Sequence, residues 1–342
     1  MNTQVGLLNL GNTCFLNSCV QVLKHIPELN KILTTSIPNK NEGADVTMIT
    51  EWKDLYSVMT SANGVLSPNK FVHMVQQVAR MKDRDLFTGW AQNDMSEFLL
   101  FLLECFHNGL ARPARVQIQG TPANQTDQRA LVCYQFIQSV YAKEYSKILE
   151  VFYGVYMTEM LDKDTRKVLS SNASHYFVLD LQLFHGDRWC QTLYDCFECS
   201  ILPELMEGDN AWMNEEAGEK QSAYKQTSYW SFPDILVISL KRFSPDGARK
   251  LQNLIDFPIE GLNLSKYSIG YNSQKNVYDL FGVCNHMGGV LGGHYTAFVK
   301  DPMDRWFHYN DSTIDPVSNV QSIVSPSAYC LFYRKKIPSC SI

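Results

Sequence analysis

The chain reads Gly6-Leu-Leu-Asn-Leu-Gly-Asn-Thr-Cys-Phe-Leu-Asn-Ser-Cys19 near its start and Gly292-Gly-His-Tyr-Thr-Ala-Phe298 near its end. The first segment offers a thiol, Cys14, and the second an imidazole, His294, 280 positions later. An imidazole can hold a thiol as thiolate and later protonate a leaving amine, so cysteine hydrolases need the two groups to meet in space. Such partners often come from opposite ends of a sequence. The two segments together predict nucleophilic catalysis.

The residues around Cys14 predict a turn followed by a helix. Gly6, Asn9 and Gly11 favour a turn, and apolar residues then recur at helical spacing until Pro27 stops the run. At a helix start, unpaired backbone N–H groups and the positive dipole end stabilise an anion, so we expect a lowered thiol pKa. The same N–H groups, helped by the side-chain amide of Asn9, would hold the oxyanion of an acyl-transfer intermediate. The alternative is that Cys14 is a small buried apolar residue.

Glycines crowd the chain just before His294, at Gly288, Gly289, Gly292 and Gly293. Glycine weakens a strand unless the backbone must bend sharply or let something approach closely, as a narrow passage for an extended peptide would require. The alternation that starts at Tyr295 is typical of a strand, so we expect His294 where a loop enters a sheet.

The segment Trp306-Phe-His-Tyr-Asn-Asp-Ser-Thr313 offers a third residue to orient the imidazole. A short aromatic strand ends at Asn310 and Asp311, 16 and 17 positions after His294, and a hairpin would bring them together. The alternative is that this pair only closes a turn, a common role for both residue types. His286 and His308 flank the site and are expected to be structural or on the surface.

Five segments resemble sequence motifs of the ubiquitin-specific protease family, and they occur along the chain in the same order as in the family. Residues 6–23 resemble its cysteine box, and residues 292–298 with 306–313 resemble its histidine box. The other similar segments are Ala91-Gln-Asn-Asp-Met-Ser-Glu-Phe-Leu99, Phe232-Pro-Asp-Ile-Leu-Val-Ile-Ser-Leu-Lys-Arg-Phe243 and Ala328-Tyr-Cys-Leu-Phe-Tyr-Arg334. The resemblance therefore covers nearly the whole chain.

The resemblance implies an α+β fold, that of a papain-like cysteine peptidase with thumb, palm and fingers. It implies hydrolysis of the isopeptide or peptide bond after the C-terminal Gly-Gly of ubiquitin through a Cys14 thioester. It makes Cys14 the nucleophile and His294 the general base, with Asn310 as the orienting third member. Asp311 becomes its helper or substitute, and Asn9 the oxyanion donor.

The same resemblance implies substrate-binding residues. Asp94 and Glu97 would lie beside the arginine-rich tail of ubiquitin, where carboxylates accept charge-assisted hydrogen bonds. The alternative for these two is a solvated helix face. Gly292, Gly293 and Tyr295 are the other expected contacts of the substrate.

One catalytic domain is expected to fill residues 1–342. Its parts are a helical thumb over about 1–110, a loop-and-helix connection over about 111–150, fingers with part of the palm over about 151–230, and the palm over about 231–336.

Smaller elements are expected inside these parts. A polar, proline-containing stretch from Arg112 to Gln128 predicts a loop, and the alternating residues from Val151 onward predict strands. Helices of the thumb, besides that of Cys14, are expected over residues 51–61, 68–81 and 92–108.

The fingers depart from the family pattern, in which two Cys-x-x-Cys pairs hold a structural zinc. The matching segments here, Thr158–Asp164 and Trp212–Glu216, contain no cysteine. Cys196 and Cys199 form one such pair, which cannot complete a four-ligand site. We therefore expect no metal and no cofactor.

Composition narrows the partners and the compartment. A net charge of −5 argues against general nucleic-acid binding and suits a partner with a basic face, such as ubiquitin. No apolar run approaches the roughly 18 residues of a membrane span. Without a secretory apolar segment at the start, the ten cysteines are expected in a reducing cytosol or nucleus.

Ubiquitin and ubiquitinated proteins are the expected partners, and an activating or recruiting protein is a further one. Two other functions remain open from the sequence. The chain would be a protease for a ubiquitin-like modifier if its fingers accept a different Gly-Gly-tailed protein. It would be a non-catalytic ubiquitin-binding scaffold if the site is misaligned.

Overall fold

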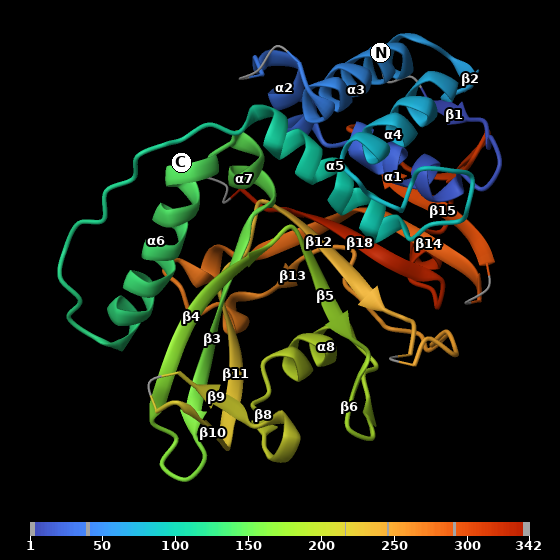
Figure 1. Ribbon diagram of the computed structural model, residues 1–342. Coiled ribbons are helices and arrows are strands. Elements are labelled where there is room, and N and C mark those ends of the chain that lie inside the picture. The colour runs from blue at the N-terminus through green and yellow to red at the C-terminus, as the bar shows by residue number, and fades with distance from the viewer. Residues whose placement is uncertain (1–3, 39–41, 216, 245, 290–291, 338–342) are drawn as a thin grey trace, which may run out of the picture.

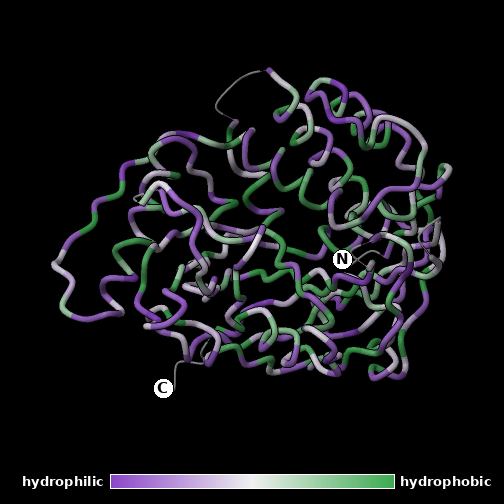
Figure 2. The backbone as a smooth tube through the Cα atoms, turned by 60° about the horizontal axis from the view of Figure 1, so that its bottom comes forward, coloured by the Kyte–Doolittle hydropathy of each residue, from purple (hydrophilic) through white to green (hydrophobic). Residues whose placement is uncertain are grey.

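The computed structural model describes residues 4–38, 42–215, 217–244, 246–289 and 292–337. Helices from the first third of the chain lie on one side of a large sheet, and a second sheet projects away from them (Figure 1). Much of the green, hydrophobic chain lies in the interior in Figure 2. The ends of the expected domain, residues 1–3 and 338–342, lie outside the described residues.

The helical part begins with a short strand pair, β1 (Val5–Leu7) and β2 (Gly64–Leu66), which run parallel. Its helices are α1 (Cys14–Lys24), α2 (Pro27–Thr35), α3 (Ala44–Ser61), α4 (Asn69–Met81) and α5 (Met95–Leu110). Pro27 was expected only to end the cysteine helix. It instead opens α2 at the first helical position, where its missing N–H costs no hydrogen bond.

Two of the expected thumb helices have different starts. Helix α3 begins at Ala44, seven residues before the expected position, because Met48 and Ile49 belong to the core. Helix α5 begins at Met95 rather than at residue 92, because the Asp94 side chain caps it. Its carboxylate accepts the N–H groups of Ser96 at 2.7 Å and Glu97 at 3.1 Å.

The large sheet has the strand order β17-β16-β15-β14-β18-β12-β5, with β13 also paired to β14. Its strands are β5 (Val178–Gln182), β12 (Ile235–Lys241), β13 (Leu262–Asn263), β14 (Val277–Gly289), β15 (Gly292–Lys300), β16 (Trp306–Asn310), β17 (Thr313–Pro316) and β18 (Ala328–Lys335). Strand β12 is buried over its first six residues, as expected of a strand covered on both faces.

The second sheet has the order β4-β3-β11-β8. Its strands are β3 (Gly154–Asp162), β4 (Val168–Tyr176), β8 (Glu204–Met206) and β11 (Ala223–Ser231). The hairpins β6 (Phe184–His185) with β7 (Arg188–Trp189) and β9 (Trp212–Asn214) with β10 (Glu219–Gln221) accompany it. Helix α8 (Leu193–Ser200) starts with a capping box between Thr192 and Asp195. Short 3₁₀ turns lie at η1 (Gly208–Asn210), η2 (Ser265–Tyr267), η3 (Ser273–Lys275) and η4 (Val320–Ile323).

Helices α6 (Gln125–Glu144) and α7 (Lys147–Phe152) connect the helical part to the strands. The loop expected up to Gln128 ends earlier, because the Asn124 side chain accepts the N–H of Asp127 at 2.9 Å and starts α6. Arg129 on α6 forms a two-point ion pair with the buried Glu159 of β3, at 3.2 and 2.7 Å. This pair fixes α6 to the second sheet. None of the described helices has the length and apolar character to cross a bilayer.

Helix α1 is buried along all of its residues, including the polar ones. It packs between α5 and the strands β14 and β15. Buried polar side chains require partners, and Gln21 finds one by donating from Nε2 to the carbonyl of Val5 at 2.7 Å. The cysteine at its first position is therefore held by a helix that cannot shift without disturbing the core.

The far end of the second sheet is held by side-chain contacts close in the sequence to Thr158–Asp164, one of the two segments where the family pattern would place zinc ligands. The guanidinium of Arg166 lies 3.5 Å from the ring centre of Tyr224. Lys163 Nζ lies 2.9 Å from a carboxylate oxygen of Glu207. Cation–π and ionic contacts of this kind join the β3–β4 turn to β11 and to the segment after β8.

Because these contacts need no metal, we predict that chelation leaves the protein intact. Thermal unfolding with and without excess EDTA should give the same midpoint, and Tyr224→Ala should lower that midpoint in both conditions. A midpoint that falls on chelation and returns on addition of zinc would contradict this prediction.

Candidate active site

Cys14 occupies the first position of α1 and is 3% exposed. The loop before it folds around the side-chain oxygen of Asn9, which accepts the N–H groups of Gly11 at 3.0 Å and Thr13 at 3.2 Å. Gly11 has φ +99°, a conformation that glycine adopts without strain. The loop is thus fixed by an internal amide rather than by its surroundings alone.

His294 lies inside β15, opposite Met287 of β14, and its side chain is 37% exposed. It was expected at the entrance of the strand. The strand instead begins at Gly292, because Gly292 and Gly293 still pair with the glycines at the end of β14.

Asn310 ends the next strand, β16, and its Oδ1 lies 2.7 Å from Nε2 of His294. An amide oxygen only accepts, so Nε2 carries the proton and Nδ1 of the neutral ring keeps a lone pair. Nδ1 is therefore the nitrogen that can take a proton. Among the described residues no hydrogen bond joins His294 to the Cys14 sulfur, although α1 packs on β15.

Asp311 contacts both the cysteine loop and the cysteine helix. Its carboxylate accepts Nδ2 of Asn17 at 2.8 Å and Nδ2 of Asn9 at 3.0 Å. Its distance to Nε2 of His294 is 4.0 Å. Asn310 therefore contacts the imidazole directly, whereas Asp311 holds the segment that carries the thiol.

The side-chain amide of Asn9 was expected to donate a hydrogen bond to an oxyanion. One of its two N–H groups already donates to the carboxylate of Asp311. Asn17 was missed, although its place three residues after Cys14 puts it on the same face of α1. That spacing was the available signal.

Burial raises the pKa of the Cys14 thiol. The backbone N–H groups of Tyr295, Phe15 and Cys14 itself oppose this rise, whereas the carboxylate of Asp311 adds to it. The expectation of a lowered thiol pKa at the helix start was therefore wrong, because loss of water outweighs the helix N–H groups. A thiol in this state needs a base to become a nucleophile.

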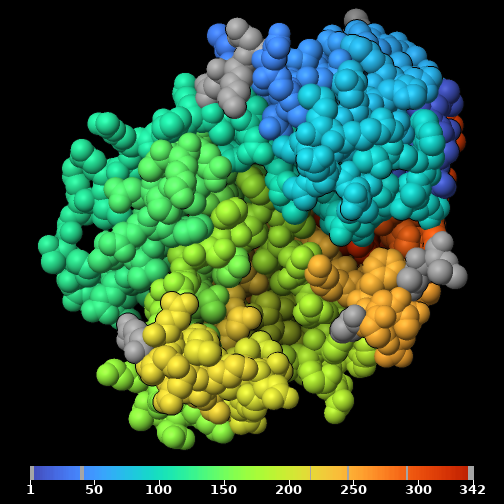
Figure 3. All heavy atoms as spheres, in the orientation of Figure 1, coloured from blue at the N-terminus to red at the C-terminus, as the bar shows by residue number. Residues whose placement is uncertain are grey.

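A cavity of about 850 Å³ opens between α5, the α6–α7 region and strands β5 and β12. Figure 3 shows this face hollowed between the helical part, α6 and the strands of the second sheet. Its lining carries an excess of carboxylates, with Lys241 as the main exposed cation. The carboxylates belong to Asp94, Glu97, Glu104, Glu144 and Asp180.

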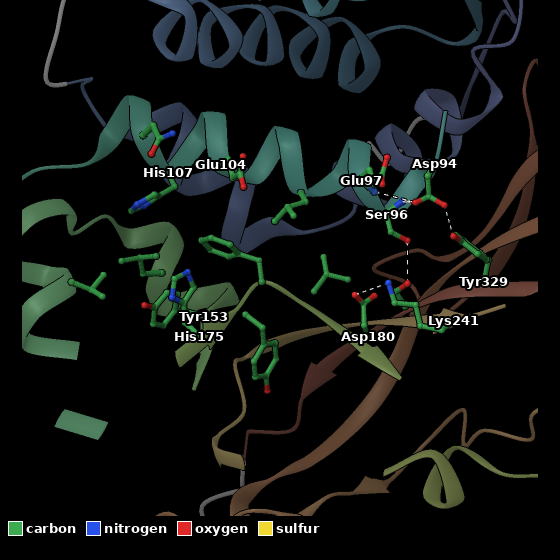
Figure 4. A pocket seen from close by; sticks show the side chains of 18 of the residues that line it. Asp94, Ser96, Glu97, Glu104, His107, Tyr153, His175, Asp180, Lys241 and Tyr329 are labelled. Atoms are coloured by element: carbon green, nitrogen blue, oxygen red, sulfur yellow. Dashed lines mark hydrogen bonds and ion pairs between the residues drawn. The ribbon is translucent and has the colours of Figure 1, made fainter. Parts of the chain in front are cut away.

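Asp94 and Glu97 lie side by side at the start of α5, at the edge of this cavity (Figure 4). The Asp94 carboxylate already has protein partners, since it caps α5 and accepts the hydroxyl of Tyr329. Glu97 is largely exposed, but the part of its carboxyl group that is shielded from water, together with the charge of Asp94, raises its pKa. Glu97 is thus the freer of the two to bind a cation.

Tyr295 and Gly293, which were also expected to contact the substrate, differ in the groups that they direct toward the site. The Tyr295 ring is buried against the rings of His286 and Tyr329, so only its backbone faces the site. Gly293 has its N–H and C=O bonded to the side chain of Gln92, at 2.8 and 3.0 Å. Gln92 had not been singled out from the sequence.

Known proteins resemble this chain in sequence over nearly its whole length. A family model described as ubiquitin carboxyl-terminal hydrolase matches residues 5–333. Ubiquitin carboxyl-terminal hydrolase 2 of Rattus norvegicus is 30% identical, over 97% of this chain and 54% of its own length. Ubiquitin carboxyl-terminal hydrolase Usp2 of Drosophila melanogaster is 31% identical, over 96% of this chain and 34% of its own length.

A solved structure shares the fold. The SAGA DUB module of Ubp8, Sgf11, Sus1 and Sgf73 bound to monoubiquitin matches with a TM-score of 0.72 and 25% identity, over 97% of this chain and 69% of that chain. The chain thus spans about half or less of the two relatives named above.

The separate contacts of Asn310 and Asp311 predict different mutant phenotypes. Asn310→Ala should lower kcat about a hundredfold with little effect on stability, because only the imidazole loses its partner. Asp311→Ala should also lower the free energy of unfolding by about 1–3 kcal/mol, because two amides lose their acceptor. Steady-state kinetics and denaturant unfolding of both variants provide the comparison. Wild-type behaviour in both would remove this segment from the site.

The raised thiol pKa predicts how Cys14 responds to pH. Only the thiolate is alkylated, so in His294→Ala the reaction of Cys14 with iodoacetamide should rise only above the ordinary thiol range near pH ~8.5. In the wild type the rise should begin at lower pH, because the imidazole accepts the proton. Peptide mass spectrometry follows Cys14 specifically, and Cys199 serves as the control whose profile should not change. Superimposed Cys14 profiles would show that His294 does not act on the thiol.

Proposed function

The chain belongs to the ubiquitin carboxyl-terminal hydrolase family, and we propose that it is a deubiquitinating cysteine protease. It would hydrolyse the isopeptide or peptide bond after the C-terminal Gly-Gly of ubiquitin. The observation that carries this proposal is the contact of 2.7 Å between His294 Nε2 and Asn310 Oδ1. It leaves Nδ1 as a base on the strand that packs against the cysteine helix.

The proposed reaction runs in two halves. Nδ1 of His294 takes the proton of Cys14, and the thiolate attacks the carbonyl carbon of the terminal glycine. The oxyanion that forms would be held by backbone N–H groups at the start of α1 and by the second N–H of the Asn9 amide. The imidazolium then gives its proton to the leaving amine, and a thioester remains.

Water completes the cycle. His294 removes a proton from water, and the resulting hydroxide attacks the thioester carbonyl. The C–S bond breaks, the proton held by the imidazole returns to the Cys14 sulfur, and the new carboxyl group of ubiquitin loses the second proton of the water to solvent. Both halves use the same nitrogen, whose lone pair depends on Asn310.

Ubiquitin is the proposed substrate for two reasons. The carboxylate-lined cavity suits a basic peptide, and Glu97 is placed to accept a charge-assisted bond from arginine. Two solved modules of similar fold are described as bound to monoubiquitin and to ubiquitin aldehyde.

We also propose an activating or recruiting partner, since Ubp8 was solved together with Sgf11, Sus1 and Sgf73. A cytosolic or nuclear location is the remaining proposal. It is supported by the chemistry, because a nucleophilic thiol must stay reduced to act.

The direct test is labelling of the purified chain by ubiquitin and by ubiquitin-like modifiers that carry a thiol-reactive C-terminal group. We expect an adduct with ubiquitin alone, lost in Cys14→Ala. Labelling by another modifier instead would assign the chain to that modifier. Ubiquitin binding without any adduct would favour a scaffold or a need for an activator.

The exposed carboxylate of Glu97 predicts a contribution to substrate affinity. Glu97→Gln should raise KM for a ubiquitin conjugate about three- to tenfold with kcat little changed, because a charged hydrogen bond to the tail is weakened. Its raised pKa gives the sign of the pH effect: as pH falls, Glu97 gains a proton earlier than an ordinary carboxyl, so the advantage of the wild type should shrink. Asp54→Asn, on α3 and outside the cavity, is the control. An unchanged KM in Glu97→Gln would remove Glu97 from the binding site.

A further inference from the structure

Gln92 connects the segments that carry His294 and Cys14. Its Oε1 accepts the N–H of Gly293 at 2.8 Å, and its Nε2 donates to the carbonyl of Gly293 at 3.0 Å. The same Nε2 lies 3.4 Å from Oδ1 of Asn12. Gly293 directly precedes His294, and Asn12 lies two residues before Cys14. One side chain therefore touches the neighbourhood of both reacting groups.

The amide of Gln92 takes the place of a strand residue on the outer edge of β15. In an antiparallel sheet, a hydrogen-bonded pair exchanges both N–H···O bonds, and Gln92 makes these same two bonds to Gly293. Residues two apart present their peptide groups to the same edge. On this edge the N–H of Tyr295 faces the Cys14 sulfur, and Ala297 pairs with Tyr309 of β16. Gln92 thus holds the edge of β15 beyond the end of β16, where no strand in the described part of the chain pairs with β15 on this side.

The glycines of β15 allow this contact. A Cβ at Gly292 would lie 2.9 Å from Oε1 of Gln92. A Cβ at Gly293 would lie 2.3 Å from Nε2 of His286, whose ring is buried against Tyr295. The strand is therefore held closely by His286 and by Gln92 immediately before His294.

Gln92 is itself firmly supported. Two residues later, Asp94 caps α5 and accepts the hydroxyl of Tyr329 on β18 (Figure 4). Two residues earlier, the carbonyl of Trp90 accepts Nδ2 of Asn12 at 3.0 Å. The segment 90–94 therefore binds the cysteine loop at one end, the histidine strand in the middle and the core of the sheet at the other end.

We propose that Gln92 is a positioning residue, which sets the separation between the His294 imidazole and the Cys14 thiol. The proposal rests on the proposed function in so far as the reaction is the one that this pair carries out. Asp311 ties the cysteine loop to the residues after β16, and Gln92 ties it to the residues before His294. Proton transfer depends steeply on distance, and a misplacement of about 1 Å can cost roughly a hundredfold in rate.

The test compares Gln92→Ala with the wild type in an assay that needs no substrate. Alkylation of Cys14 by iodoacetamide is followed against pH by peptide mass spectrometry. In Gln92→Ala we expect alkylation at pH 7 to be slower by about tenfold and the profile to move to higher pH, towards that of His294→Ala. Asn93→Ala is the matched control, since among the described residues the Asn93 side chain bonds to Ala91 alone, in its own loop. Its profile should equal that of the wild type.

A second assay separates positioning from substrate contact. With a fluorogenic ubiquitin C-terminal amide, Gln92→Ala should lower kcat about tenfold and change KM less than about twofold. Should Gln92→Ala fail to fold, Gln92→Glu replaces it, because it keeps the shape but sets a carboxylate oxygen against the carbonyl of Gly293. The same slower alkylation at neutral pH is expected of it.

Three results would overturn the proposal. The first is an alkylation profile of Gln92→Ala equal to that of the wild type. The second is faster alkylation at neutral pH, which would show that Gln92 restricts access to Cys14. The third is a raised KM with unchanged kcat, which would show that Gln92 contacts the substrate. If the wild type does not cleave the ubiquitin amide at all, the proposed substrate is wrong. The alkylation assay then still decides the role of Gln92.

Discussion

The site depends on the hydrogen bonds of the Asp311 carboxylate. They join the cysteine loop and the buried cysteine helix to the end of the histidine hairpin. Its partners Asn17 and Asn9 lie 294 and 302 positions earlier in the chain. Its backbone carbonyl accepts the N–H of Leu7 in β1 at 2.9 Å. Hydrogen bonds to a charged group contribute about 1.5–3 kcal/mol each, so these contacts link the two ends of the sequence with appreciable energy. Assembly of the site and folding of the domain are therefore one event.

The same carboxylate has a chemical cost. It adds to the burial that raises the thiol pKa of Cys14, so the contact that places Cys14 also favours its protonated form. His294, whose Nε2 is bonded to Asn310, is the base that we propose for this thiol. The two adjacent residues thus have different contacts. Asn310 orients the imidazole, and Asp311 holds the helix and loop that carry the thiol.

Local patterns were enough to predict much of the fold. The apolar spacing after Cys14 and the aromatic strand ending at Asn310 predicted α1 and β16, because each pattern has the period of its element. Contacts between distant segments could not be read in this way. A buried amide such as Asn17 looks like any polar residue in a helix until its acceptor, far along the chain, is known. The thiol pKa was wrong for a related reason: the helix start is visible in the sequence, whereas the loss of water around Cys14 is a property of the packed molecule.

The Asn17–Asp311 contact couples the cysteine helix to the histidine hairpin. A double-mutant cycle of Asn17→Ala and Asp311→Ala, read by the free energy of unfolding, measures that coupling directly. We expect the double variant to be less destabilised than the sum of the single variants, by about 1–2 kcal/mol. Additive effects, with a coupling near zero, would show instead that the two ends of the chain are held together by other contacts.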